Sequence, residues 1–388
     1  MKSGAAAAIL TFGLLSASSL TARADERLWM QAAINGKPVR LCFDSGASDL
    51  VLLREATRRL GLKVTYPPTG SVLKPGEVSA GTTEECLLKL QNSSVKTRFR
   101  VIDVPDYLNP QFDGVLGWAP LRQNRFRIDA EAQTLTWLTD LPKETQTWTK
   151  LRVVKRSPFL QLELPRSNGK SGTVFVDTGD TKGVGLNPEA WQAWRLSHPN
   201  RPITLTAFFT PSAGLLVEEE SWANELSLGP LVLTEVPVTE AMPLALIIPR
   251  FRASFGLAAL KRLDFVVDGR RGLVYLRSKH TAPPVYEHNR LGAVFVPANP
   301  QSNDLIAQVA DGTPAQEAGI RAGDVLLKVD EVDVTKWRTD PTVLPLSRFF
   351  ARPEGTQIDL TLKRKEETFK IMVTLRNILP PDPGVLKP

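Results

Sequence analysis

Two short segments of the sequence each place an aspartate at a sharp turn after an apolar run. They are Asp44-Ser45-Gly46 and Asp177-Thr178-Gly179, and each is followed by a second apolar segment. Aspartate and glycine are poor strand residues, so each segment indicates a turn between two buried strands. Two copies of one unusual turn predict two half-sites that meet at one centre.

Paired aspartates suit general acid–base chemistry. Two carboxyl groups held close together do not both ionise readily, so the pair shares one proton. We expect the ionised member to take a proton from water and the protonated member to donate to a carbonyl oxygen, without a metal or a cofactor. Gly46 and Gly179 would allow close backbone approach, and Ser45 and Thr178 could hydrogen-bond across the pair.

A predicted hairpin leads into each aspartate. The expected strands and turns are residues 27–34, Asn35-Gly36 and residues 38–43 before Asp44, and residues 159–164, Asn168-Gly169 and residues 173–176 before Asp177. A short helix over residues 54–60, ended by Gly61, is expected in the first unit. In the second unit Asn187 is a good N-cap and Pro188 suits the first helical position, so a helix should begin there.

The sequence contains an internal duplication. The ends of the two units align without a gap at an offset of 139 positions (256 − 117). The matched pairs are Gly117 with Gly256, Leu121 with Leu260, Arg122 with Lys261, Phe126 with Phe265, and Asp129 with Asp268. A repeat with so long a period predicts two lobes rather than a solenoid.

The twin turns resemble those of the aspartic proteases of the pepsin and retropepsin group. Each turn is followed in its unit by an apolar-apolar-glycine element, Val115-Leu116-Gly117 in the first unit and the less apolar Ser254-Phe255-Gly256 in the second. The resemblance covers roughly residues 26–277. It implies an all-β, two-lobed aspartic protease fold, a duplicated acid-protease barrel, with lobes over residues 25–148 and 149–280.

The resemblance also implies roles for individual residues. Asp44 and Asp177 correspond to the catalytic dyad, and Ser45, Gly46, Thr178 and Gly179 support it. A cleft between the lobes would bind an extended polypeptide substrate. Flaps over the cleft would fall at residues 71–81 and 210–214. A single chain that carries both half-sites has no need to dimerise, so a monomer is expected.

Two positions depart from the pepsin pattern. Ala47 and Asp180 follow the turn glycines, where pepsins usually carry serine or threonine. Loss of a hydrogen-bond donor and gain of a negative charge should both raise the proton affinity of the dyad. This predicts activity nearer neutral pH. Asp180 leaves open a catalytically inactive protein that binds peptides on the same fold.

The C-terminal part resembles a PDZ domain of the kind attached to bacterial exported proteases. The segments that carry the resemblance are Gly312-Thr313-Pro314-Ala315, Ala318-Gly319-Ile320 and Gly323-Asp324-Val325-Leu326. It implies a small α+β unit over residues 281–378 that takes a protein C-terminus as an added strand. The loop Leu291-Gly292-Ala293-Val294 would hold the terminal carboxylate. A domain that only packs against the protease is the alternative, and residues 379–388 are expected to be a frayed tail.

The composition adds expectations about location and partners. Residues 1–24 have the features of a secretory signal, with Ala22-Arg23-Ala24 at the cleavage site and no following cysteine for a lipid anchor, so a periplasmic or secreted protein is expected. No later segment is apolar enough for a membrane span. The net charge is +7 but the basic residues are scattered, which argues against nucleic-acid binding.

The cysteines and histidines predict no further chemistry. Cys42 and Cys86 are expected to be buried free thiols rather than a disulfide, and no spacing typical of a metal site is present. The three histidines, His198, His280 and His288, are expected to be solvated surface residues. No Gly-x-Ser-x-Gly elbow is present, which argues against a serine hydrolase.

Overall fold

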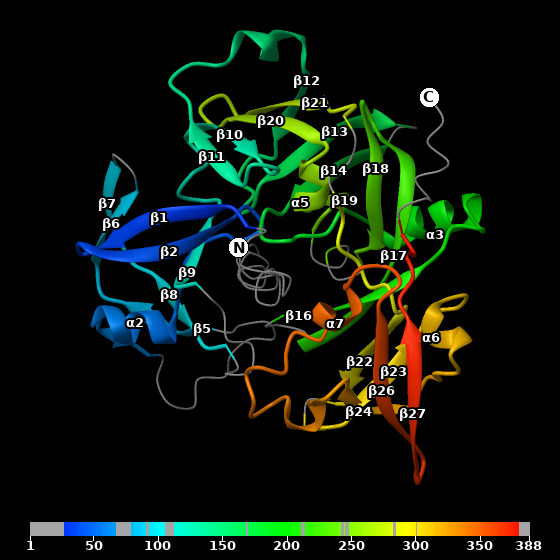
Figure 1. Cartoon of the computed structure of the whole chain (residues 1–388). Coiled ribbons are helices and arrows are strands. Elements are labelled where there is room, and N and C mark those ends of the chain that lie inside the picture. Colours follow the sequence, from blue (N-terminus) through cyan, green and yellow to red (C-terminus); the bar gives the residue numbers. More distant parts are fainter. Residues whose placement is uncertain are drawn as a thin grey trace, which may run out of the picture.

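A computed structural model provides the structure of the chain (Figure 1). It describes residues 27–66, 79–90, 93–104, 112–167, 170–210, 214–241, 244, 248–281, 285–299 and 301–379. The predicted signal segment, the Asn168-Gly169 turn and most of both predicted flaps lie outside these residues. Within them, no helix has the length and apolar character needed to cross a membrane.

The described part of the first lobe is built on a nine-stranded sheet. Its strands, in order across the sheet, are β4 (Val64–Thr65), β5 (Ser79–Thr83), β8 (Arg100–Ile102), β3 (Leu50–Leu53), β9 (Gly114–Gly117), β2 (Lys37–Asp44), β1 (Trp29–Ile34), β6 (Cys86–Leu90) and β7 (Ser93–Thr97). Helix α2 (Arg54–Leu60) follows β3 directly and ends at Gly61. The predicted hairpin and helix are therefore confirmed.

The second sheet has twelve strands over the described ranges. In order they are β11 (Thr134–Trp137), β10 (Arg125–Asp129), β20 (Leu263–Asp268), β21 (Leu273–Ser278), β12 (Thr149–Val153), β13 (Gln161–Ser167), β14 (Lys170–Val176), β19 (Phe251–Phe255), β15 (Val184–Leu186), β18 (Leu231–Glu240), β17 (Gly214–Leu228) and β16 (Thr204–Thr210). The helices are α3 (Pro188–Ser197), α5 (Leu257–Leu260) and the 3-10 helix η3 (Lys143–Thr147). Asn187 Oδ1 accepts the Ala190 amide at 2.8 Å, which confirms the predicted cap of α3.

Equivalent strands of the two units pair with each other inside the second sheet. Strands β10 and β20 run antiparallel, with Arg127 opposite Val266. These two residues differ by the duplication offset of 139 positions (266 − 127). When duplicated strands pair antiparallel with equivalent residues opposite each other, the pair has a local two-fold axis. The axis passes between Arg127 and Val266, and the two lobes are joined there.

The C-terminal unit has a sheet and a core of its own. Its strands are β22 (Ala293–Pro297), β23 (Leu305–Val309), β24 (Val325–Val329), β26 (Gln357–Arg364) and β27 (Glu367–Thr374), with β25 (Val332–Asp333) paired to β24. Its helices are α6 (Pro314–Glu317), α7 (Ser347–Phe350) and the 3-10 helix η4 (Val334–Lys336). Phe295, Leu326 and Phe350 belong to its buried core. The expected small α+β unit is confirmed.

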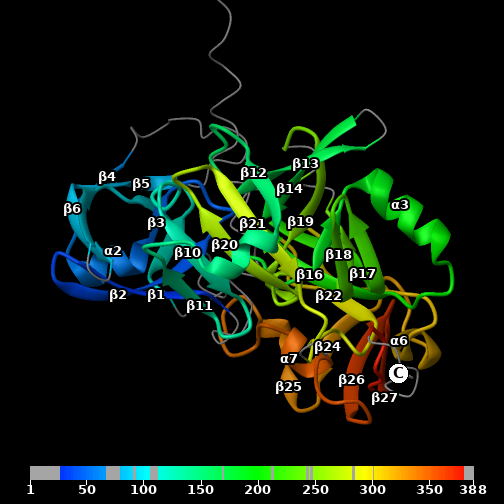
Figure 2. The ribbon, with the colours of Figure 1, turned by 90° about the horizontal axis from the view of Figure 1, so that it is seen from above.

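The C-terminal unit packs against the second lobe. In Figures 1 and 2 its orange and red elements lie beside the green strands of that lobe, and β22 faces β16. Val294 and Val296 of β22 form an apolar cluster with Leu205 of β16. Thr204 Oγ1 donates to the Asn289 carbonyl at 2.6 Å, and Asn289 Nδ2 donates to the Leu205 carbonyl at 2.9 Å.

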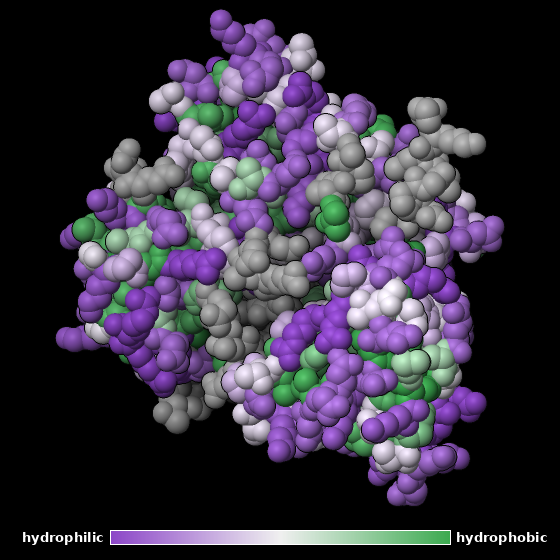
Figure 3. Space-filling model, viewed as in Figure 1, coloured by the Kyte–Doolittle hydropathy of each residue, from purple (hydrophilic) through white to green (hydrophobic). Residues whose placement is uncertain are grey.

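The outer surface is mostly polar in the view of Figure 3, with small apolar areas between charged side chains. The large apolar residues that stay exposed are Tyr66, Leu87, Val95, Leu196, Leu215, Val232, Val285 and Met372. They come from several separate elements. Among the residues that the structure describes, this scattered distribution is ordinary for a folded protein.

Two expectations about the linker and tail are wrong. His288 is buried rather than solvated, and its Nε2 accepts the amides of Ile378 and Leu379 at 3.1 and 3.3 Å. Leu379 is also buried and forms an apolar cluster with Ile378 and Trp222, so the expected fraying is wrong at residue 379, and residues 380–388 lie outside the described range. Residues 378 and 379 contact the linker and the second lobe, a long-range contact that local sequence does not encode.

Acid should weaken this attachment through His288. Burial lowers the pKa of His288 from 6.5 to about 4. The folded state therefore resists protonation, and its stabilisation is present above pH 6.5 and is lost as the pH falls from 6.5 to about 4. We expect this group to remove about 3 kcal/mol of unfolding free energy across that range.

Denaturant unfolding at pH 7 and pH 4 measures this loss. The H288A variant should lack this part of the acid dependence. The matched H280A variant, at an exposed linker histidine, should keep it. Equal acid dependence in wild type and H288A would contradict the assignment.

Candidate active site

Each predicted aspartate lies where a buried strand meets a turn. Asp44 is the last residue of β2, which pairs in parallel with β9 so that Asp44 is opposite Gly117. Asp177 follows β14, which pairs in parallel with β19 so that Val176 is opposite Phe255. The same strand arrangement therefore positions both aspartates.

The two predicted apolar-apolar-glycine elements pack closely against the backbone of the turns. A Cβ on Gly117 would lie 2.5 Å from the Asp49 carbonyl oxygen, and one on Gly256 would lie 2.4 Å from the Lys182 carbonyl oxygen. Contacts that short are not tolerated, so only glycine lets each element approach its turn so closely. The second element makes the same close approach as the first, although it contains the polar residue Ser254.

The predicted cross-links between the turns are present. Ser45 Oγ donates to the Val176 carbonyl at 2.6 Å and accepts the Thr178 amide at 3.1 Å. Reciprocally, Thr178 Oγ1 donates to the Phe43 carbonyl at 2.9 Å and accepts the Ser45 amide at 2.9 Å. All four bonds join one lobe to the other. Because both side chains are fully buried, the bonds are shielded from water and fix the separation of the turns.

The two carboxyl groups face each other across these turns. A Cβ on Gly46 would lie 2.7 Å from Asp177 Cγ, and a Cβ on Gly179 would lie 2.5 Å from Asp44 Cγ. Each turn amide also binds its own aspartate: Gly46 N donates to Asp44 Oδ1 at 2.8 Å and Gly179 N donates to Asp177 Oδ1 at 3.0 Å. The Asp44 and Asp177 side chains also hydrogen-bond to each other, and both are buried.

The electrostatics of the two carboxyl groups differ. Burial raises the pKa of Asp44 to about 6, although Asp177, the Gly46 and Ala47 amides and Arg27 oppose the rise. Burial raises the pKa of Asp177 well above its ordinary value, and the charges of Asp44 and Asp180 raise it further. Burial therefore favours a proton shared by the pair, and the charge of Asp180 favours its place on Asp177.

Asp180 belongs to a cluster of charged residues with Lys182 and Glu218, which was not predicted from the sequence. Asp180 Oδ1 accepts the Lys182 amide at 3.0 Å, so it caps its own turn. Lys182 Nζ donates to Glu218 Oε2 at 2.6 Å and lies 3.5 Å from the ring centroid of Phe208. Burial depresses the pKa of Lys182, but Glu218 and Asp180 outweigh that effect and raise it. Of the run Glu218-Glu219-Glu220, only Glu218 pairs with Lys182, so the sequence carried no specific signal for this pair.

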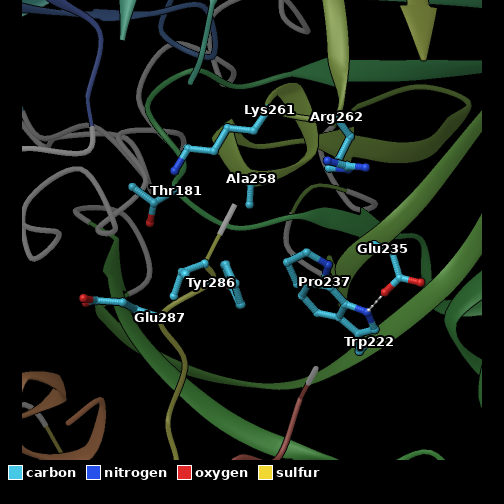
Figure 4. A pocket seen from close by; sticks show the side chains of 10 residues that line it. Thr181, Trp222, Glu235, Pro237, Ala258, Lys261, Arg262, Tyr286 and Glu287 are labelled. Atoms are coloured by element: carbon cyan, nitrogen blue, oxygen red, sulfur yellow. Dashed lines mark hydrogen bonds between the residues drawn. The ribbon is translucent and has the colours of Figure 1, made fainter. Parts of the chain in front are cut away.

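Behind the second turn lies a separate small pocket (Figure 4). It is lined by Thr181, Trp222, Glu235, Pro237, Ala258, Lys261, Arg262, Val285, Tyr286 and Glu287. Trp222 Nε1 donates to Glu235 Oε2 at 2.8 Å, the dashed line in the view. Thr181 belongs to the active-site turn and Tyr286 to the linker, so the pocket marks where the linker reaches the back of the turn.

The remaining cysteine expectation is confirmed. Cys42 and Cys86 are free and buried. Burial raises the pKa of the Cys42 thiol to about 12, so it stays protonated beside the dyad. Over the described ranges, histidine, cysteine and acidic residues form no group of three or more that could hold a metal ion.

In the C-terminal unit, two amides of the predicted carboxylate-binding loop are hydrogen-bonded within the protein. The amides of Leu291 and Gly292 both donate to Asn289 Oδ1, at 3.0 and 3.2 Å. Ala293 is buried in β22, and Val294 packs against the second lobe. Asn289 therefore occupies two amides that a terminal carboxylate would need, and the carboxylate-binding role of residues 291–294 stays a prediction.

Comparisons with known proteins agree with both resemblances. Residues 30–119 match a family model described as aspartyl protease, and residues 305–364 match a model described as PDZ domain. Protease RseP of Yersinia pestis is 33% identical over 78 residues, which are 18% of this chain and 16% of that protein. The chain thus matches only about a sixth of the length of this relative.

A solved structure is also similar to part of the chain. The retroviral protease-like domain of Ddi1 from Leishmania major is 22% identical and is covered over 95% of its length by 30% of this chain, with a TM-score of 0.24. From the two family models, the chain combines an aspartyl protease-like domain with a C-terminal PDZ domain.

Removing one hydroxyl from the cross-links should destabilise the protein. In T178V the buried Phe43 carbonyl and Ser45 amide both lose their partner, so we expect a loss of about 2–4 kcal/mol of unfolding free energy. The matched control is T368V, at an exposed position of β27, which should be nearly neutral. Denaturant unfolding of both variants is the measurement. Unchanged stability of T178V would show that these bonds do not hold the lobes together.

Proposed function

We propose that this chain is an exported aspartic endopeptidase that hydrolyses peptide bonds with a water activated between Asp44 and Asp177. The observation that carries the proposal is the pair of buried carboxyl groups facing each other across two cross-linked turns. The match of the first lobe to an aspartyl protease model supports it. The substrate is a polypeptide bound in an extended form.

In this mechanism the two aspartates have different roles. Asp44 accepts a proton from water as the oxygen attacks the carbonyl carbon, and Asp177 donates its proton to the carbonyl oxygen. Collapse of the tetrahedral intermediate sends the proton on Asp44 to the leaving amine and returns one to Asp177. The neighbouring groups support this division, since Asp180 raises the pKa of Asp177, whereas the Gly46 and Ala47 amides and Arg27 oppose the rise at Asp44.

For the PDZ domain we propose binding of a protein C-terminus, from a substrate or a partner. The domain's edge strand β22 pairs only with β23 within its own sheet. The amides of Leu291 and Gly292 would first have to exchange Asn289 for the incoming carboxylate.

The proposal of export to the periplasm or outside the cell rests on the leader-like residues 1–24. N-terminal sequencing of the mature protein, expected to begin at Asp25, tests it.

A second candidate is a catalytically inactive protein that binds peptides in the same cleft. The observation that favours it is Asp180, whose charge beside Asp177 makes the second carboxyl harder to ionise. The two candidates predict the same peptide affinity but opposite results in a cleavage assay.

Cleavage of a mixed peptide library tests the catalytic role of the dyad. We expect wild-type residues 25–388 to cleave, and D44N and D177N each to lose at least about 100-fold in kcat/KM, because each removes one partner in proton transfer. The matched control D140N, at an exposed aspartate, should cleave normally. Intact peptides at every pH, with the protein folded, would favour the peptide-binding alternative.

The pH profile should be shifted toward neutrality. Because the pKa of Asp44 is raised to about 6, cleavage should rise as the pH increases through about 6. It should fall again only when Asp177 loses its proton. In D180N the pKa of Asp177 should drop, so the alkaline limb of the kcat/KM profile should move to lower pH. A wild-type optimum below about pH 4, near an unperturbed carboxyl, would contradict this.

A further inference from the structure

Arg27 is a buried cation next to the dyad. It is 2% exposed, which is unusual for arginine. The position lies two residues before β1 and outside the segments that define the twin turns. Its burial so close to a catalytic strand therefore requires a physical explanation.

The β1–β2 hairpin brings Arg27 near Asp44. Strands β1 and β2 are antiparallel with Trp29 opposite Cys42, and the Phe43 amide donates to the Leu28 carbonyl at 2.9 Å. Arg27 comes directly before Leu28 and Asp44 directly after Phe43, so both lie at the same end of the hairpin. The charge of Arg27 acts on Asp44 there and opposes the rise of its pKa.

Two aromatic rings lie next to the guanidinium of Arg27. Arg27 Cζ lies 5.0 Å from the ring centroid of Phe112 and 5.9 Å from that of Trp29. A guanidinium stacks on aromatic faces and remains charged under all relevant conditions. The positive charge is thus buried inside the protein, nearer to Asp44 than to Asp177.

Other charged and titratable groups surround the dyad from the neighbouring elements. On the Asp44 side Arg27, Arg40 and Cys42 share one face of the β1–β2 pair. On the Asp177 side Asp180 lies in the same turn, with Lys182 and Glu218 beyond it. Positive charge is therefore nearest to Asp44, and negative charge is nearest to Asp177.

We propose that Arg27 is a positioning residue that fixes which aspartate is ionised, assigning the negative charge to Asp44 and leaving the proton on Asp177. The proposal rests on the proposed function, since it explains how the two roles are divided. A nearby opposite charge favours the ionised form of a carboxyl group. Arg27 and Asp180 act in the same sense from opposite sides, so the dyad is polarised before any substrate binds.

The test compares pH profiles of kcat/KM for wild type, R27M, R27K and R40M. Loss of the charge in R27M should move the acidic limb to higher pH, with a smaller effect on the alkaline limb. R27K keeps the charge and should hold the acidic limb near its wild-type position. R40M removes another arginine that stacks on Trp29, at 3.7 Å, and should move the acidic limb less than R27M does, because Arg27 and not Arg40 is among the charges that act on Asp44.

A titration that needs no turnover separates this inference from the proposed function. The carboxyl carbons of 13C-labelled aspartates are followed by NMR against pH, with D44N and D177N to assign the dyad signals. In R27M the first titration of the dyad should move to higher pH, and R27K should restore it. Circular dichroism confirms that each variant is folded.

The outcomes are distinct. An unchanged acidic limb and an unchanged first titration in R27M would overturn the role of Arg27, even if D44N and D177N abolish cleavage. A wild-type protein that never cleaves would overturn the proposed function, and the NMR titration would still decide the role of Arg27. If R27M does not fold, R27Q replaces it, because a neutral amide of similar length removes the charge with less loss of polarity.

Discussion

The crossed hydrogen bonds between the two active-site turns are the constraint on which the rest of the site depends. Ser45 and Thr178 each donate to a carbonyl of the opposite lobe and each accept an amide from the opposite turn. Neither turn can satisfy its buried polar groups without the other. The same bonds bring Asp44 and Asp177 together in a buried place, where both pKa values are raised. A single lobe would keep its strands but would have no dyad.

A chain of contacts connects the second turn to the PDZ domain. Asp180 raises the pKa of Asp177, and Lys182 links that turn to Glu218 on strand β17. Strand β17 pairs with β16, which packs against β22 and binds Asn289 at the start of the PDZ domain. The turn, the hairpin and the PDZ domain are therefore one continuous set of contacts. In this arrangement the domain packs on the protease lobe as part of its structure.

Much of the fold could be predicted because its signals are local. An aspartate and a glycine after an apolar strand specify the turns at Asp44 and Asp177, and Asn187-Pro188 specifies the start of α3. The burial of His288 could not be predicted, because its partners, the amides of Ile378 and Leu379, lie 90 and 91 residues away. The hydrogen bonds from the Leu291 and Gly292 amides to Asn289 were likewise not predicted, because they depend on how this loop folds.

The sequence by itself determined the two half-sites, their duplication and the identity of the paired aspartates, because these depend on residue types at short spacing. Only the tertiary structure decided the asymmetry of the pair. The charges that set it come from Arg27, which precedes strand β1, and from Asp180 and its Lys182–Glu218 partners. Electrostatic interaction in a buried site depends on distance and desolvation, and both are fixed only when separate segments of the chain pack together.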